Sequence, residues 1–269
     1  MAFGCVLGLL SACRSQPVKA PEPYDSAAKP ADADVRVITS KSGKTYRYFD
    51  TGDPGSSQDT SKSDRDLEAE RVALLSAQLA IGKVPKTDIV DVNRRSRGVA
   101  KTSIVRTKPQ FYPKLTELIA SLPRDSEMRQ LNIDRETPRV PQEMRFVATC
   151  AWIVATRRED NGDYHVIVSN GAKTFMNMEI SGIPDRGNKM DREQLITVRK
   201  VFEGFVEETA RSTGNYTGWG DPVSVYVEGP LFYDIDTRPG AAGPKGSRPK
   251  TSWAIHPVAH IDFESKKCR

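Results

Sequence analysis

Apolar positions are most regularly spaced in the second half of the chain, between residues 144 and 180. Residues 144–156 (MRFVATCAWIVAT) form a long run that is apolar on both faces, which predicts a buried strand. Turn residues follow at 158–162, and residues 163–169 alternate between apolar and polar side chains. Asn170-Gly171 marks a second turn before residues 173–180, whose even and odd side chains fall on opposite faces. Three antiparallel strands are therefore expected.

A helical pattern follows these strands at residues 191–211. Asp191 and Gln194 form a capping-box pattern. Four apolar side chains then recur at helical spacing: Leu195, Val198, Phe202 and Phe205. Two more strands are predicted, one at residues 222–228 that bends at Gly229-Pro230 into residues 231–235, and one at residues 256–264. The predicted order is three strands, one helix and two strands.

This order resembles the OB-fold, a five-stranded Greek-key barrel with its helix between the third and fourth strands. The resemblance covers about residues 142–265, and the long first strand agrees with it. We therefore predict an α+β fold that is mainly β, with an OB-like barrel domain in residues 141–269. Within it, Ile255-His256-Pro257-Val258 is similar to the last strand of some uncharacterised secreted bacterial proteins, a likeness that implies no function.

Residues 35–140 are expected to form a hairpin and helical extension of this domain. A hairpin is predicted at residues 35–50, an amphipathic helix at 63–82 and a short helix at 113–121. Residues 83–108 hold eight Lys or Arg and two Asp, including Arg94, Arg95 and Arg97. Such a segment either binds anions or is a solvated basic connection. The lack of interleaved aromatic residues favours the connection.

The first thirteen residues indicate an export signal. Residues 2–12 form an apolar stretch ending in small side chains, which has the size of a signal-peptide core and is too short to cross a bilayer. Leu10-Ser11-Ala12-Cys13 resembles the lipobox of bacterial lipoproteins, in which the Cys thiol receives a diacylglycerol and the chain is cut before it. The resemblance implies a signal peptide at residues 1–12, lipidation of Cys13 and a place in the cell envelope, facing the periplasm where an outer membrane is present. The alternative is a buried N-terminal strand or helix with a chance cysteine.

Residues 13–34 have the composition of a flexible tether. Residues 14–33 include four Pro and five Ala but one aromatic residue, too little apolar surface to offset the entropy of ordering. The whole chain agrees, because 38% hydrophobic residues among 269 is a low share for a compact domain. No run of about 18 apolar residues occurs in the sequence, which excludes a hydrophobic spanning helix.

The four cysteines fit an exported protein. Cys5 would leave with the signal and Cys13 would carry lipid, so the mature domain keeps Cys150 and Cys268. Thiols in an oxidising compartment commonly pair, so we predict a Cys150–Cys268 disulfide. Their wide spacing excludes the short C-x-x-C metal and redox motifs.

Candidate ligand-binding residues lie where OB domains usually bind, on the face of the second and third strands and in the loops after the first and fourth strands. The predicted outward set on the two strands is His165, Phe175, Asn177 and Glu179. Arg157 and Arg158 lie at one end, and residues 238–250 carry four cations without an acid: Arg238, Lys245, Arg248 and Lys250. Cations beside an aromatic side chain suit an anionic, partly planar ligand. The alternative is a loop that is basic for solubility, with Phe175 packed under residues 35–82.

Signals for enzyme chemistry are weaker. Asn161-Gly162-Asp163 with the later Gly182-Ile183-Pro184-Asp185 is similar to secreted thermonucleases, but Asn177 and Gly182 stand where that pattern has Arg and Asp. His260 and Asp262 share a strand face about 7 Å apart, too far to hold one ion. The motifs G-x-S-x-G, H-E-x-x-H and the P-loop are absent from the sequence. We therefore predict no catalytic residue, metal or cofactor.

These features predict an envelope-anchored lipoprotein that serves as a binding or accessory module. Its partners would be the membrane, through the lipid, and an anionic polymer, a headgroup or an envelope protein. The lack of a nucleic-acid motif argues against nucleic acid, although the net charge is +5. The alternative is a divergent envelope hydrolase or nuclease-like enzyme on the same barrel. Convergent carboxylates, histidines or a metal would support the enzyme, and a basic groove with an aromatic floor would support binding.

Overall fold

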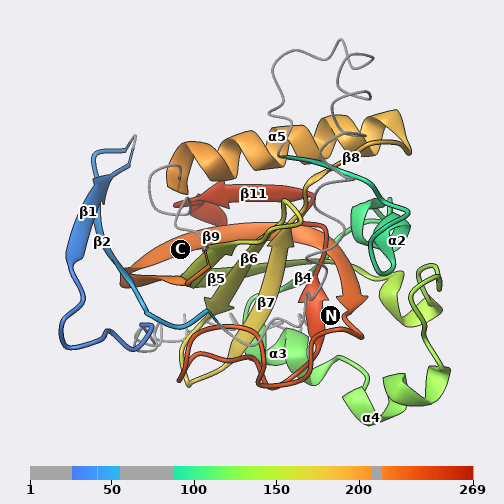
Figure 1. The fold of residues 1–269 in the computed structure, drawn as a ribbon, viewed down its shortest axis with the longest axis horizontal. Helices are drawn as coiled ribbons and strands as arrows, with labels where there is room; N and C mark the ends of the chain where they lie inside the picture. The colour runs from blue at the N-terminus through green and yellow to red at the C-terminus, as the bar shows by residue number, and fades with distance from the viewer. Residues whose placement is uncertain (1–25, 41, 55–87, 207–213, 269) are drawn as a thin grey trace, which may run out of the picture.

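A computed structural model describes residues 26–40, 42–54, 88–206 and 214–268 (Figure 1). The predicted signal peptide, Cys13, most of the tether and the predicted helix at residues 63–82 lie outside these residues. The described part is a mixed α+β structure dominated by strands, with four α-helices. This confirms the mainly β, α+β class.

Five strands close into a ring, because each of them pairs with two others. The ring runs through β5 (Phe146–Arg158), β6 (Tyr164–Ser169), β7 (Phe175–Ile180), β10 (Trp253–Ile255) and β9 (Thr217–Tyr233), which pairs back with β5. Only the pairing of β7 with β10 is parallel among these five; the other four are antiparallel. The three antiparallel strands predicted between residues 144 and 180 are therefore confirmed.

Further strands extend this sheet on its outside. The predicted hairpin is confirmed as β1 (Val35–Thr39) and β2 (Thr45–Asp50), and β2 pairs with the start of β9. β4 (Gln110–Tyr112) runs parallel to β5, and β11 (His260–Phe263) pairs with β9. β3 (Ile89–Val90) and β8 (Ile183–Pro184) form a separate two-stranded sheet. Within residues 35–140, β2 and β4 thus share hydrogen bonds with the ring.

The last predicted strands differ from the structure in detail. The segments predicted on either side of Gly229-Pro230 form one continuous strand, β9, which pairs with β5 up to Pro230 and with β10 from Leu231. A Cβ at Gly229 would lie 2.5 Å from the Pro257 carbonyl oxygen, so glycine permits this close crossing of two chain segments. The single strand predicted at residues 256–264 is two strands, because the chain leaves the sheet at His256-Pro257, whose peptide bond is cis, and rejoins it as β11.

The described helices are α2 (Gly98–Thr102), α3 (Leu115–Ala120), α4 (Asp125–Met128) and α5 (Lys189–Val206); η2 (Arg129–Leu131), η3 (Pro141–Glu143) and η4 (Lys266–Cys268) are short 3-10 turns. α3 and α5 confirm the helices predicted at residues 113–121 and 191–211, although residues 207–213 lie outside the described part. α5 follows β8 and lies beside β11 (Figure 1). It buries Leu195, Val198 and Phe202, as its spacing predicts.

The core follows the two-residue period of the ring strands. Tyr164, Val166 and Val168 of β6 face the main apolar cluster, as do alternate side chains of β7, which include Met176 and Met178. The opposite faces of both strands therefore carry the odd-numbered residues, among them the predicted outward set.

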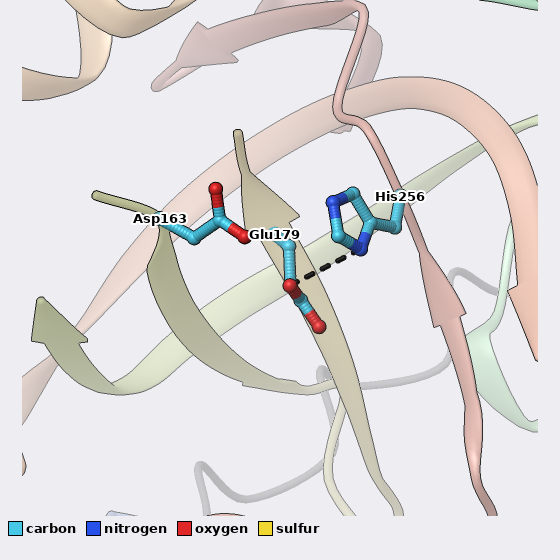
Figure 2. Close-up of side chains that lie close together, drawn as sticks. All are labelled: Asp163, Glu179 and His256. Atoms are coloured by element: carbon cyan, nitrogen blue, oxygen red, sulfur yellow. Dashed lines mark ion pairs between the residues drawn. The ribbon is translucent and has the colours of Figure 1, made fainter. Parts of the chain in front are cut away.

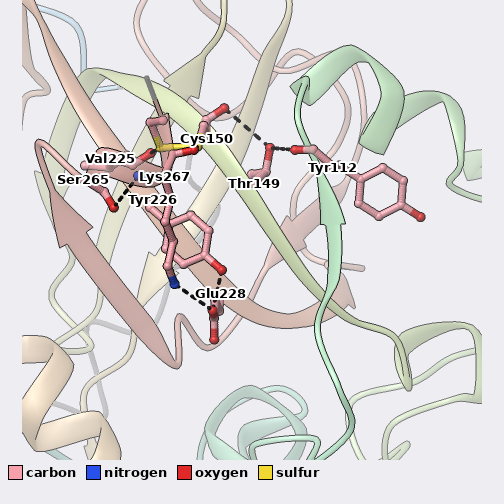
Figure 3. Close-up of a disulfide and its surroundings, with 9 residues drawn as sticks. Tyr112, Thr149, Cys150, Val225, Tyr226, Glu228, Ser265 and Lys267 are labelled. Carbon is pink, nitrogen blue, oxygen red and sulfur yellow. Dashed lines mark hydrogen bonds and ion pairs between the residues drawn. A yellow bond between two sulfur atoms is a disulfide. The ribbon is translucent and has the colours of Figure 1, made fainter. Parts of the chain in front are cut away.

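The predicted disulfide between Cys150 and Cys268 is confirmed (Figure 3). It joins the middle of β5 to the turn after β11, with the two Cα atoms 5.5 Å apart and 118 positions between the residues. The pairing of β11 with β9 brings the C-terminal turn next to β5, because Cys150 lies opposite Tyr226 of β9 and Phe263 lies opposite Val225.

Candidate functional site

The predicted outward set shares one face of β6 and β7, but the prediction that this face is exposed is wrong. His165, Phe175, Asn177 and Glu179 are all buried, with at most 9% of each residue exposed. Phe175 packs in an apolar cluster with Phe49 of β2. Residues 238–250 also lie on this face, since a Cβ on Gly243 would come within 3.1 Å of the Ile167 side chain. The hairpin and the basic loop thus cover the predicted aromatic platform.

The basic loop at residues 238–250 has a fixed internal structure. The two ends of the loop are joined by a hydrogen bond of 2.7 Å, in which Gly240 N donates to Pro249 O. Asp53, beyond the end of β2, accepts from Lys245 N at 2.8 Å and from the Arg248 guanidinium at 3.0 Å. The side chain of Arg248 is 35% exposed. Three cations of the loop point into solvent: Arg238, Lys245 and Lys250.

Arg157 and Arg158 do not join the basic loop as free cations. Arg157 is 5% exposed, forms an ion pair with Glu159 and lies over the ring of Tyr216 at 4.7 Å. Arg158 pairs with the buried Asp88 at 2.5 Å. The expectation that both arginines, Phe175 and the loop form one contiguous binding surface is therefore wrong, because Arg157 and Phe175 are buried.

The side chains of Arg95 and Arg97 are buried in the described part of residues 83–108, which corrects the interpretation of this segment as a solvated connection. Arg97 is fully buried and pairs with Glu143 at 2.6 Å. Arg95 is 8% exposed and pairs with Asp163. Arg94, 30% exposed, lies 3.7 Å from Asp91. Arg95 and Arg97 are part of the folded interior and tie residues 88–102 to other segments, whereas Arg94 pairs within its own segment.

A buried polar cluster at one end of the ring was not predicted as a site (Figure 2). Asp163 precedes β6, Glu179 lies in β7 and His256 follows β10, and their side chains point toward one another. Among the described residues, each of the three offers one ligand atom, and these atoms lie within 4.8 Å of one another. His256 Nδ1 and a carboxylate oxygen of Glu179 are 3.1 Å apart. All three residues are buried.

Polar neighbours fix the orientation of this cluster. His256 Nε2 lies 2.9 Å from Ser181 Oγ, and Ser181 Oγ donates to the backbone carbonyl of Lys101 at 3.0 Å. Asp163 Oδ1 accepts from Gly182 N at 2.6 Å. Glu179 Oε1 accepts from Asn177 Nδ2 at 3.0 Å and lies 3.3 Å from His165 Nε2.

The protonation of the two histidines differs because their neighbours differ. Burial lowers the pKa of His165. Glu179 and Glu159, on either side of its imidazole, outweigh burial and raise that pKa well above its ordinary value. Burial lowers the pKa of His256 to about 4. Glu179 and Asp163 raise this pKa, but Lys101 and Arg95 lower it, so the effect of burial prevails. Burial also raises the pKa of Glu179, but His256, His165 and Lys101 outweigh it and hold that pKa low. At neutral pH His256 is therefore neutral, Glu179 is ionised, and the neighbouring His165 is cationic.

Two kinds of chemistry can be considered for this arrangement. The order Ser181, His256 and Glu179 is that of a nucleophile, a base and an orienting acid. However, Ser181 is 1% exposed, its hydroxyl hydrogen is directed to Lys101 O, and Gly182 N is already bonded to Asp163. The geometry is better suited to cation coordination, for which two carboxylates and one imidazole are ordinary ligands.

His256 is hydrogen-bonded to Ser181, and His260 is exposed. The spacings within residues 256–264 argue against a metal site, but they do not include the contact of His256 with Glu179 of β7. His165 lies directly opposite Glu179 because Ser169 pairs with Phe175, which leaves residues 170–174 as the loop. A two-residue turn at Asn170-Gly171 would instead place His165 opposite Met176, so the sequence alone does not pair His165 with Glu179.

No family model matches the chain, and no curated protein or solved structure matches it. None of the described helices combines the length and apolar character needed to cross a membrane.

Proposed function

We propose that this chain is an exported, lipid-anchored protein that binds an anionic ligand through the basic loop at residues 238–250. Lipidation at Cys13 is supported by the resemblance of Leu10 to Cys13 to a lipobox. The Cys150–Cys268 pair supports an oxidising compartment, because disulfides persist there and are rare where thiols are kept reduced.

We further propose that the five-stranded ring is an OB-type barrel. Its pairing order of β5, β6, β7, β10 and β9 supports this assignment, as does the parallel pairing of β7 with β10. α5 lies between the third and fourth ring strands, where the OB-fold has its helix. The basic loop then joins the fourth and fifth strands, a position from which OB domains commonly contact ligands.

The observation that carries the binding proposal is the fixed display of three exposed cations by this loop. Arg238, Lys245 and Lys250 lie in a segment that contains no acid. The hydrogen bonds within the loop and to Asp53 mean that little ordering entropy remains to be lost when a ligand binds. Because the cations are exposed, their attraction is screened by salt, and the expected binding is weak and strongly dependent on ionic strength.

The experiment compares two triple variants with the same change in net charge. One carries Arg238→Gln, Lys245→Gln and Lys250→Gln in the loop. The other carries Lys108→Gln, Lys114→Gln and Lys200→Gln, at exposed positions elsewhere on the chain. Both are passed over a dextran sulfate column, and the salt concentration at elution is measured. Arg94, Arg95 and Arg97 are unsuitable controls because ion pairs involve them in the fold.

We expect the loop variant to elute at clearly lower salt than the wild type, and the control variant to shift much less. A shift of equal size in both variants would mean that net charge alone governs retention. Retention of the loop variant at the wild-type position would refute the proposed surface.

A further inference from the structure

We propose that Asp163, Glu179 and His256 bind a divalent transition-metal ion of the Zn²⁺ class. The inference goes beyond the proposed function, because the three side chains belong to the interior and the basic loop is a surface feature. It rests on three observations: the convergence of the donor atoms, an imidazole nitrogen that lacks a hydrogen bond, and outer contacts that orient each ligand.

The donor atoms converge from three separate segments of the chain (Figure 2). A Zn²⁺ ion with bonds of about 2.0–2.2 Å to nitrogen and oxygen holds its ligand atoms roughly 3–4 Å apart. The oxygen of Glu179 and Nδ1 of His256 are already 3.1 Å apart, and no pair of the three ligand atoms exceeds 4.8 Å. Side-chain adjustments on the order of 1 Å would therefore complete the coordination.

The hydrogen bonds of His256 leave a lone pair on Nδ1 facing the Glu179 carboxylate. Ser181 Oγ donates its hydrogen to Lys101 O, so it accepts from His256 Nε2. A neutral imidazole that donates from Nε2 has an unprotonated Nδ1. His256 Nδ1 is fully buried, has no hydrogen-bond partner and faces the Glu179 carboxylate. Two acceptors at 3.1 Å without a hydrogen between them repel each other, and a cation bound to both removes that repulsion.

Each ligand also has an outer contact of the kind that metal sites use for orientation. His256 has Ser181 on its other ring nitrogen, and Asp163 has the backbone N–H of Gly182. Glu179 has the amide of Asn177, a residue two positions earlier on the same face of β7. These contacts hold the ligand atoms in place before an ion arrives.

Arg95 limits how tightly an ion can bind. Its guanidinium pairs with Asp163, so an entering ion must displace part of that ion pair. The cationic His165 and Lys101 are further positive charges beside Glu179, and they also weaken ion binding. We therefore expect moderate affinity, and we expect Ca²⁺, which prefers an all-oxygen shell, to bind less well than Zn²⁺.

The test uses the full chain carrying Cys5→Ser and Cys13→Ser, so that no free thiol competes for the ion. After treatment with EDTA and dialysis, Zn²⁺ is titrated by calorimetry into this protein and into variants with Asp163→Asn, Glu179→Gln or His256→Gln. The matched control is His260→Gln, because His260 is exposed and lies outside the cluster. The loop triple variant serves as a second control.

We expect about one Zn²⁺ per chain and at least a tenfold loss of affinity in each ligand variant, in line with the sensitivity of metal sites to such changes. His260→Gln and the loop variant should bind as the parent does. Absence of Zn²⁺ binding by the parent, tighter binding of Ca²⁺ than of Zn²⁺, or equal losses in His260→Gln and His256→Gln would each overturn the proposal.

A measurement on the parent chain covers the case in which a ligand variant does not fold. Imidazole ¹⁵N resonances distinguish the three histidines, and Zn²⁺ should shift Nδ1 of His256 while leaving His260 unchanged. A shift confined to His260 or His165 would place the ion elsewhere. Retained Zn²⁺ binding in the loop variant also separates this proposal from the proposed function, since either can fail without the other.

Discussion

Replacing Arg97 with methionine should be among the most destabilising single changes in the described part of the chain. All five N–H groups of this guanidinium are used: two donate to Glu143, and the others donate to the carbonyl oxygens of Thr137, Pro138 and Tyr233. The side chains of Arg97 and Glu143 are both fully buried. Arg97 therefore ties residues 135–143 and the end of β9 to α2.

The expected magnitude follows from what the methionine leaves behind. Removing one partner of a buried ion pair costs about 3–5 kcal/mol, because the other charge stays in the interior. Glu143 would keep its bonds from Val140 N at 2.9 Å and Tyr233 N at 2.8 Å, which moderates that cost. Three carbonyl groups lose a donor, and each such loss costs on the order of 1 kcal/mol or more. A total of at least about 4 kcal/mol is expected, or a fall in Tm of roughly 8–16 °C for a chain of this size.

The assay is equilibrium unfolding in urea with the disulfide intact, checked by thermal unfolding. Arg238→Met is the control, because this arginine is exposed on the basic loop, and it should change stability by less than about 0.5 kcal/mol. Glu143→Gln should resemble Arg97→Met, since it leaves the guanidinium without its counter-charge. A cost below about 1 kcal/mol for Arg97→Met would refute the argument that this pair holds residues 88–102 to the ring.

Two further predictions concern the covalent link and a buried tyrosine. The double variant Cys150→Ser with Cys268→Ser should lose up to about 4.9 kcal/mol in the chain-entropy model, because the bridge joins residues 118 positions apart. A reductant should lower the urea midpoint of the wild type but not of the double variant. An unchanged wild-type midpoint would contradict the prediction. Tyr164 donates to Glu203 at 3.0 Å, and burial with that carboxylate raises its pKa to about 12, whereas a tyrosine in the unfolded chain has a pKa near 10. The stability that this shift contributes is complete below pH 10 and is lost as pH rises toward 12. The urea midpoint of Tyr164→Phe should therefore fall less steeply with pH above 10 than that of the wild type. Identical pH dependence of the two midpoints would count against the shift.

The strands were predictable because their signals are local. Alternation in residues 163–169 and 173–180, with turn residues between them, predicts the hairpin but not its register, in which Ser169 lies opposite Phe175. The helix α5 likewise follows from its own spacing. The disulfide required one additional inference, that the exported domain keeps only two thiols. Each of these predictions uses residues that are close in sequence or a count over the whole chain.

The buried charges were not predictable in the same way, because their partners are distant in sequence. Arg97 meets Glu143 across 46 positions, and Arg95 meets Asp163 across 68. Nothing near Arg95 or Arg97 distinguishes them from solvated cations, and a single sequence does not show which carboxylate each will meet. His256 joins Glu179 only because β10 runs parallel to β7, a pairing set by the closure of the ring.

The covering of the β6–β7 face changes the kind of ligand that this protein is expected to bind. With Phe175 exposed, stacking on an aromatic ring would favour a planar ligand. The structure places Phe175 among Phe49, Ile167 and Tyr216, so it offers no ring for stacking. What remains outside is charge on a loop held by Asp53. We propose that these charges respond to the number and spacing of anionic groups on a ligand. Sulfated or phosphorylated polymers and anionic headgroups meet that requirement, and binding of this kind should vanish at high salt, because it includes no large apolar contact that salt would leave intact.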